Sequence, residues 1–166
     1  MVEITPTEIL SINWAAYGTL LDMSGSGLTP SAINEWNGAD WVDRNTKFAV
    51  APQHGFLGMT TASPLPCVVS QAERHFHTDE LLLPAGQPLC FLLAKADCDA
   101  PAPQDMTAVI LRPGMAFLIK KGVWHSAAHG FGTPAPYYYI ADVYSGEPTV
   151  WHTVGDIIVS YPQADT

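Results

Sequence analysis

The residues with the clearest chemical potential lie in one short segment, 73-ERHFHTDE-80. His75 and His77 are two residues apart, so in an extended strand both imidazoles would point to the same face. Glu80 follows after a possible tight turn, and its carboxylate could return to the same point. The spacing indicates a metal site, with a proton-transfer site or a polar rim without metal as the alternatives.

A further ligand would have to come from a distant part of the chain. His125 is the best candidate, because it lies in 121-KGVWHS-126 just after a glycine that marks a turn. Three imidazoles and a carboxylate suit a divalent transition metal such as Zn, Mn, Fe or Ni, and the sequence does not choose among them. The expected ligands are His75, His77, Glu80 and His125, with Asp79 as a rival to Glu80.

Composition limits the kinds of partner that the protein can have. The chain has 166 residues, a formal net charge of −9 and no basic cluster larger than the pair Lys120–Lys121. This argues against nucleic acid and against an anionic membrane surface, since both require a basic footprint. Hydrophobic residues make up 48% of the chain and charged residues only 14%. We therefore expect a homodimer that hides part of the apolar surface.

The compartment is suggested by the cysteines and by the start of the chain. Three cysteines are an odd number, and they show no CxxC spacing. No charged segment followed by an apolar one marks a signal peptide. We therefore expect a reducing, cytoplasmic location.

Most of the chain consists of short β-like runs separated by turn residues. We expect strands over 14–21, 46–50, 55–61, 67–76, 80–84, 88–96, 107–112, 115–119, 137–144 and 156–160. Fourteen prolines argue against a helical protein, although a short helix could form over 30–36. The spacing favours an all-β, mainly antiparallel sandwich or barrel. We expect a single domain over 1–166, in which an N-terminal strand and loop over 1–45 pack on the barrel.

These residues resemble the two sequence motifs of the cupin barrel, a jelly roll with few short helices. In cupins the HxH pair, a following Glu and a later His bind the metal. The chain is most similar to the ureidoglycolate lyase family, which also adopts a cupin barrel. The matching residues are Glu73, Arg74, His75, Pro84, Gly86, Pro113, Gly114, Lys121, Gly122, Val123, Trp124, His125 and Asp142. The chain differs at His77, where the family usually has an apolar residue, and at Glu80, where it usually has Gln.

The resemblance implies metal-assisted cleavage of ureidoglycolate into glyoxylate and urea. His125, Lys121 and Arg74 would be the catalytic residues. Arg74 and Lys121 would also hold the carboxylate of this small acid. Tyr137 and Tyr139 share one face of the strand expected over 137–144 and could donate hydrogen bonds to the substrate.

Other assignments stay open at this point. Arg74 alternates with His75 and could face outward, Lys121 could be a solvated surface amine, and the tyrosines could line an interface. The extra ligands His77 and Glu80 favour a metal-dependent cupin isomerase or dioxygenase as the alternative activity. A non-catalytic cupin that binds a small acid is the third alternative.

Overall fold

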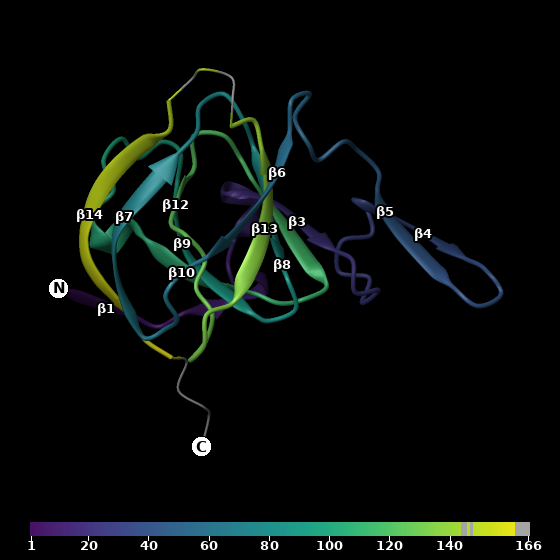
Figure 1. The fold of residues 1–166 in the computed structure, drawn as a ribbon, viewed down its shortest axis with the longest axis horizontal. Helices are drawn as coiled ribbons and strands as arrows, with labels where there is room; N and C mark the ends of the chain where they lie inside the picture. The colour runs from purple at the N-terminus through teal and green to yellow at the C-terminus, as the bar shows by residue number, and fades with distance from the viewer. Residues whose placement is uncertain (144–145, 147, 162–166) are drawn as a thin grey trace.

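The computed structural model describes residues 1–143, 146 and 148–161, and its main body is built from two curved β-sheets (Figure 1). The larger sheet has the order β1–β14–β7–β12–β9–β10–β2 and consists of Val2–Ile4 (β1), Val150–Val159 (β14), Cys67–Arg74 (β7), Trp124–His125 (β12), Leu89–Ala94 (β9), Thr107–Leu111 (β10) and Thr7–Glu8 (β2). The smaller sheet has the order β3–β11–β8–β13–β6 and consists of Gly18–Asp22 (β3), Met115–Ile119 (β11), Glu80–Pro84 (β8), Pro136–Ala141 (β13) and Phe56–Thr61 (β6).

The remaining elements are short. Ile33–Asn37 (β4) and Val42–Thr46 (β5) form a hairpin that extends away from the two sheets (Figure 1). Three 3-10 helices occur in the described part of the chain, at Ile9–Ser11, Trp14–Ala16 and Pro103–Asp105. None of these helices is long and apolar enough to cross a bilayer.

The arrangement confirms the predicted fold class. Neighbouring strands run antiparallel, except that β1 is parallel to β14 and β2 is parallel to β10. The two sheets curve around a common interior, as in a cupin-type jelly roll (Figure 1).

Large apolar side chains fill the interior between the sheets. Phe91 from β9 packs in one core cluster with Leu82 from β8 and Phe117 from β11, and all three are fully buried. The alternate positions of β9 face a second core, where Leu92 and Trp124 are buried. A strand that is buried on both faces has a continuous apolar run instead of an alternating one, which explains the segment 89-LCFLLA-94.

The N-terminal third of the chain differs from the sequence prediction. The helix considered over 30–36 is wrong, because Ile33–Asn37 is extended and pairs along its whole length with Val42–Thr46. The strand expected over 46–50 is also wrong beyond its first residue, since β5 ends there. Both errors have one cause. The extended conformation of β4 and β5 is stabilised by their pairing with each other, and the local sequence of either strand alone does not indicate this pairing.

Other strands are present with shifted ends. The strand expected over 14–21 begins at Gly18, the one over 156–160 begins at Val150, and the one over 137–144 occupies Pro136–Ala141. Tyr144, which belonged to the last of these predictions, lies outside the described residues.

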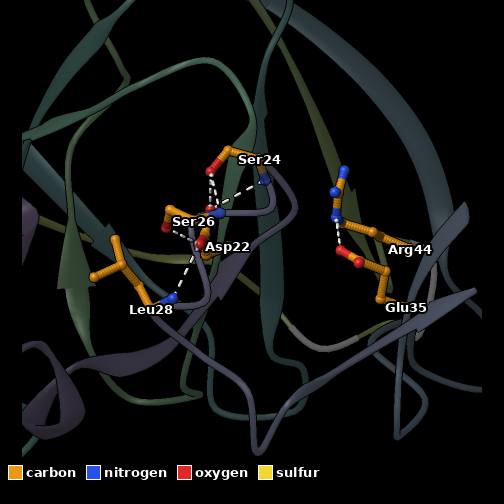
Figure 2. A network of polar contacts seen from close by, with 6 residues as sticks. All are labelled: Asp22, Ser24, Ser26, Leu28, Glu35 and Arg44. Atoms are coloured by element: carbon orange, nitrogen blue, oxygen red, sulfur yellow. Dashed lines mark hydrogen bonds and ion pairs between the residues drawn. The ribbon is translucent and has the colours of Figure 1, made fainter. Parts of the chain in front are cut away.

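A buried carboxylate holds the loop that leaves β3. Asp22 is 3% exposed and accepts hydrogen bonds from the Ser24 amide and hydroxyl at 3.0 and 2.5 Å (Figure 2). The Ser26 hydroxyl and the Leu28 amide donate to the same carboxylate. The Asp22 amide donates to Thr29 Oγ1 at 2.9 Å. One side chain therefore fixes the conformation of the loop between β3 and the hairpin.

We predict that Asp22→Ala lowers the free energy of unfolding by about 1–3 kcal/mol, because several donors lose a buried acceptor. Glu35→Gln is the matched control. Its carboxylate lies 2.7 Å from the Arg44 guanidinium in a largely exposed ion pair (Figure 2), and losing such a pair costs about 0–1 kcal/mol. Urea unfolding followed by circular dichroism measures both values. A loss in Asp22→Ala no larger than in Glu35→Gln would contradict the structural role of Asp22.

Candidate functional site

Two strands of the larger sheet bring the first residues of the site together. Glu73 on β7 and His125 on β12 are direct partners in the antiparallel register, so their side chains lie on the same face of the sheet. β7 ends at Arg74, which is earlier than the end expected at residue 76. His75 follows directly, and its side chain joins those of Glu73 and His125 because it lies two residues beyond Glu73.

Glu73, His75 and His125 form a group with the geometry of a metal site. One potential ligand atom from each residue lies within 4.8 Å of the others. The rings of His75 and His125 have their centroids 5.4 Å apart. Nε2 of His125 is buried and has no hydrogen-bond partner, whereas Nε2 of His75 is buried beside the carboxylate of Glu80. Buried polar atoms are normally paired, so an unpaired imidazole nitrogen next to a second imidazole and a carboxylate fits the ligands of a small ion.

Glu80 approaches the same point from the smaller sheet. It is the first residue of β8 and pairs in register with Ile119 of β11. Its carboxylate Oε2 lies 3.2 Å from His75 Nε2, and the two side chains are only 12% and 11% exposed. The site is therefore enclosed between the two sheets and combines two imidazoles with two carboxylates.

A cavity of about 190 Å³ opens beside these residues. It is lined by Glu73, His75, Glu80, Thr60, Tyr137, Tyr139, Val143 and Thr149. Among the lining residues that the structure describes, none is a lysine or an arginine. The cavity thus has carboxylates, hydroxyls and imidazoles, and a negatively charged ligand would need a cation that the side chains do not supply.

The carboxylates of the site have opposite pKa shifts. Burial raises the pKa of Glu73 to about 7, and the neighbouring charge of Glu80 adds to the increase while His75 opposes it. Burial also acts to raise the pKa of Glu80, but His125 and His75 outweigh it and the pKa is lowered. Glu80 is therefore the carboxylate that stays ionised, and Glu73 is the one that holds a proton near neutral pH in the absence of a metal.

The imidazoles and the nearest tyrosine complete the electrostatics. Burial acts to lower the pKa of His75, but the hydrogen bond and charge of Glu80 raise it overall. Burial lowers the pKa of His125, with Glu80 opposing. The lowered pKa favours the neutral imidazole of His125, which has a lone pair for a metal. Burial raises the pKa of Tyr137, so its hydroxyl remains a hydrogen-bond donor.

His77 does not join this group, although the sequence suggested that it shares a face with His75. Because the chain leaves the strand at Arg74, the two rings are edge-on with centroids 6.0 Å apart. His77 Nε2 instead forms a 2.8 Å hydrogen bond with the carbonyl oxygen of Asp142. A carbonyl only accepts, so Nε2 carries a proton.

Lys121 and Asp79 also lie elsewhere. Both line a second cavity, together with His77 and the loop 49–52. The Asp79 carboxylate accepts a 2.8 Å hydrogen bond from the backbone amide of Lys121. Asp79 therefore stabilises the turn at Lys121. The structure therefore does not bring the Lys121 ammonium to the cavity that contains His75.

Arg74 faces away from the site, as strict alternation along β7 requires. Its guanidinium is stacked between the rings of Phe76 and Trp124, at 4.4 and 4.3 Å from their centroids. Nη1 also donates to the carbonyl oxygen of Cys98 at 3.4 Å. This arrangement explains the packing of Arg74 by cation–π contacts and leaves no route to a ligand beside His75.

Glu73, Thr60 and Thr149 line the cavity but were not identified as site residues from the sequence. Glu73 was noted only as part of the Glu-Arg-His triplet, although its spacing to His75 places both on one face of a strand. Thr149 had no signal, because its neighbour His75 is 74 positions away. In the structure, Thr149 Oγ1 lies 3.2 Å from His75 Nδ1, and this contact directs Nε2 of the ring toward Glu73, Glu80 and His125.

We predict that Thr149→Val lowers the affinity for a divalent metal by roughly 10–100-fold, because loss of such a supporting contact frees the ligand to rotate. Thr149→Ser keeps the hydroxyl and is expected to retain most of the affinity. Titration of metal into chelator-treated protein, followed by calorimetry, measures the difference. Equal affinities for the valine and serine variants would show that the hydroxyl does not orient His75.

We predict that Glu73 makes the metal-free protein less stable as pH rises. Its pKa is 4.5 unfolded and about 7 folded, so the unfolded state loses the proton first. Stability falls between these two values and then stays level, by on the order of 3 kcal/mol. Glu73→Gln removes this dependence, so the stability difference between variant and wild type should grow over this window. Parallel stability curves for the two proteins would contradict the raised pKa of Glu73.

Comparison with known proteins assigns the chain to a family. The chain matches the ureidoglycolate lyase family over residues 1–156. No curated protein matches it. Among solved structures, it resembles a 3,4-ketoisomerase from Helicobacter canadensis (14% identity, TM-score 0.50, covering 72% of this chain and 86% of the other). It also resembles a TDP-quinovose 3,4-ketoisomerase from Campylobacter jejuni (12% identity, TM-score 0.50, covering 80% and 90%).

At such low identity the structural likeness concerns the fold alone, which agrees with the two-sheet barrel described above. The family match is different in kind, because it spans almost the entire sequence. It includes every residue that lines the cavity around His75. The chain therefore belongs to the ureidoglycolate lyase family of the cupin superfamily.

Proposed function

We propose that the protein is a metal-assisted carbon–nitrogen lyase that cleaves ureidoglycolate into glyoxylate and urea. The observation that carries the proposal is the buried group of two imidazoles and two carboxylates beside a small cavity without a lysine or arginine among its described lining residues. Without a cation, an anionic substrate would be repelled by the ionised carboxylate of Glu80. A divalent cation balances these charges and gives the substrate carboxylate a partner.

Glu73, His75 and His125 are the residues that we propose as metal ligands. The sequence suggested His75, His77, Glu80 and His125; this set keeps His75 and His125, replaces His77 by Glu73, and gives Glu80 a different role. The unpaired Nε2 atom of His125 and the potential ligand atoms of all three residues, which lie within 4.8 Å of one another, support it. The group suits a divalent transition metal such as Zn, Mn, Fe or Ni. When bound, such an ion would act as a Lewis acid toward the hydroxyl and carboxylate oxygens of the substrate.

Glu80 is the residue that we propose for proton transfer. Its pKa is lowered, so it is ionised and able to accept a proton. It takes the proton of the substrate hydroxyl as the carbon–oxygen double bond of glyoxylate forms and the carbon–nitrogen bond breaks. It then returns this proton to the departing nitrogen, which yields urea. The proton balance closes inside the cavity, and no external acid is needed.

The hydroxyl groups of the smaller sheet are proposed to orient the substrate. Thr60, Tyr137 and Tyr139 point into the cavity from β6 and β13. Tyr137 keeps its proton because its pKa is raised, so it can donate to a carboxylate or ureido oxygen. These groups take over the role that the sequence suggested for Arg74 and Lys121, neither of which lines this cavity.

The size of the cavity favours a small acid. Pockets for drug-sized ligands typically occupy about 300–1,000 Å³, whereas this cavity has about 190 Å³. A nucleotide-linked sugar, such as the TDP-sugar named for the Campylobacter jejuni neighbour, is a much larger ligand. A metal-dependent isomerase or dioxygenase, or a protein that only binds an acid, is the alternative that the following experiment separates from a lyase.

We predict that the purified protein contains a divalent transition metal and releases urea from ureidoglycolate. Chelation should abolish the release, and returning the metal should restore it. Glu80→Gln should keep the metal and lose about 10²–10⁴-fold in rate, as removal of a proton-transfer group does. Glu35→Gln, on the exposed hairpin, is the control and should match the wild type. Metal analysis by mass spectrometry and a urea assay give both readouts.

Each other outcome of this experiment contradicts the proposal in a distinct way. Metal without urea release would indicate a different metal-dependent reaction. Urea release that survives chelation would indicate a lyase without metal. Binding of ureidoglycolate without turnover would indicate a carrier or sensor.

A further inference from the structure

The two segments that supply the site also meet on the opposite face of the larger sheet. Glu73 on β7 and His125 on β12 are register partners, so the residues next to them, Arg74 and Trp124, lie opposite each other on the other face. The Arg74 guanidinium is 4.3 Å from the centroid of the Trp124 ring, in agreement with this placement. An arginine–tryptophan pair therefore lies directly behind the proposed metal ligands.

The backbone holds these ligands at the very ends of their strands. β7 ends at Arg74, and β12 consists only of Trp124 and His125. His75 lies beyond the end of β7, where the Gly122 amide donates a 2.6 Å hydrogen bond to the His75 carbonyl oxygen. A two-residue strand has few ladder hydrogen bonds, whereas a metal site requires ligands that are fixed to a fraction of an ångström. Side-chain contacts can supply the additional constraint.

Arg74 and Trp124 share one hydrogen-bond acceptor. The carbonyl oxygen of Cys98 accepts from the Trp124 indole at 2.7 Å and from Arg74 Nη1 at 3.4 Å. Cys98 lies in the turn after β9, where its amide donates to the carbonyl oxygen of Lys95. β9 is the other neighbour of β12 in the sheet (Figure 1). These contacts therefore connect β7, β12 and the end of β9 behind the site.

The guanidinium of Arg74 is held mainly by aromatic faces. Phe76 contributes the second ring, with its centroid 4.4 Å from the guanidinium carbon. In the described part of the chain, Arg74 Nε is buried without a hydrogen-bond partner, and none of the ion pairs includes Arg74. Ion pairing therefore does not explain the position of this arginine, whereas planar stacking between two rings does.

We infer that Arg74, stacked between Trp124 and Phe76, positions Glu73, His75 and His125 relative to one another. We call the three stacked side chains the Arg74 clamp. The clamp fixes β12 against the end of β7, and in this way sets the separation between the ligands of the two strands. Arg74 is thus a positioning residue, in place of the catalytic role that the sequence suggested for it. The inference rests on the metal site proposed above, but not on the reaction.

Metal titration tests the clamp with a readout other than activity. Zn²⁺ is added to chelator-treated protein, and binding is followed by calorimetry. Arg74→Leu should lower the affinity by roughly 10–100-fold, the usual effect of removing a group that supports a metal ligand. Arg74→Lys should lose nearly as much, because lysine keeps the charge but has no planar group to stack. A Zn²⁺ affinity of either variant equal to that of the wild type would overturn the inference.

A control variant separates positioning from a general loss of stability. Val159→Ala removes buried volume from the core cluster that contains Trp124. Val159 lies at the end of β14 that pairs with Cys67, whereas Arg74 pairs with the opposite end of this strand. The variant should lower the free energy of unfolding in urea and leave the Zn²⁺ affinity unchanged. An affinity loss as large as that of Arg74→Leu would overturn the inference.

Phe76→Leu provides a test even if the Arg74 variants fail to fold. Phe76 is 54% exposed, so the variant should keep its fold, and loss of one ring from the stack should weaken Zn²⁺ binding by about 2–5-fold. Trp36→Leu removes a ring of similar exposure, 58%, from the hairpin and should have no effect. Equal Zn²⁺ affinities of these two variants would count against the clamp.

Hydrogen exchange of the metal-free protein distinguishes a failure of this inference from a failure of the proposed metal site. The Gly122 amide, which donates to the His75 carbonyl oxygen, should exchange faster in Arg74→Leu and Phe76→Leu than in the wild type. The Cys90 amide, which donates to the His129 carbonyl oxygen at 2.8 Å near the other end of β9, should not change. A wild type that binds no Zn²⁺ would contradict the metal site, whereas unchanged exchange at Gly122 would contradict the clamp.

Discussion

The structure depends on one electrostatic constraint, namely the burial of two carboxylates and two imidazoles at the same point between two sheets. Glu80 lies 3.2 Å from His75, and Glu73 and His125 face each other in register. The described residues around the cavity include no lysine or arginine. Burying two carboxylates without a cation is costly. This cost raises the pKa of Glu73 to about 7, so that Glu73 keeps its proton near neutral pH in the absence of a metal. A divalent ion bound by Glu73, His75 and His125, as proposed above, would replace this proton.

The fold meets this constraint by dividing the site between its two sheets. The larger sheet supplies Glu73, His75 and His125, and the smaller sheet supplies Glu80 and the hydroxyl groups. Phe91, Phe117 and the other buried residues between the sheets hold the two contributions at a fixed separation. The proposed metal ligands thus come from the larger sheet and the residue that follows β7. The groups that would contact the substrate, including Glu80, come mainly from the smaller sheet.

The sequence predicted the barrel because its strands have strong local signals. One is the apolar run of β9, and another is the strand expected over 115–119, which has the same bounds as β11 in the structure. It failed over the hairpin, where pairing between β4 and β5 overrides a weak local preference. Within the site, His75, Glu80 and His125 were found from motif spacing. His77 was misplaced because the end of β7 could not be located to within two residues. Thr149 could not be found, since only the tertiary fold brings it to His75.

The central claim is that one cation lies between Glu73, His75 and His125. Anomalous scattering from crystals of the protein, collected on both sides of the absorption edge of the metal found in it, tests this most directly. The account predicts one strong peak at about 2.0–2.2 Å from Nε2 of both histidines and from a carboxylate oxygen of Glu73. A peak bound by His77 instead, or no peak at this point in a protein that cleaves ureidoglycolate, would contradict it.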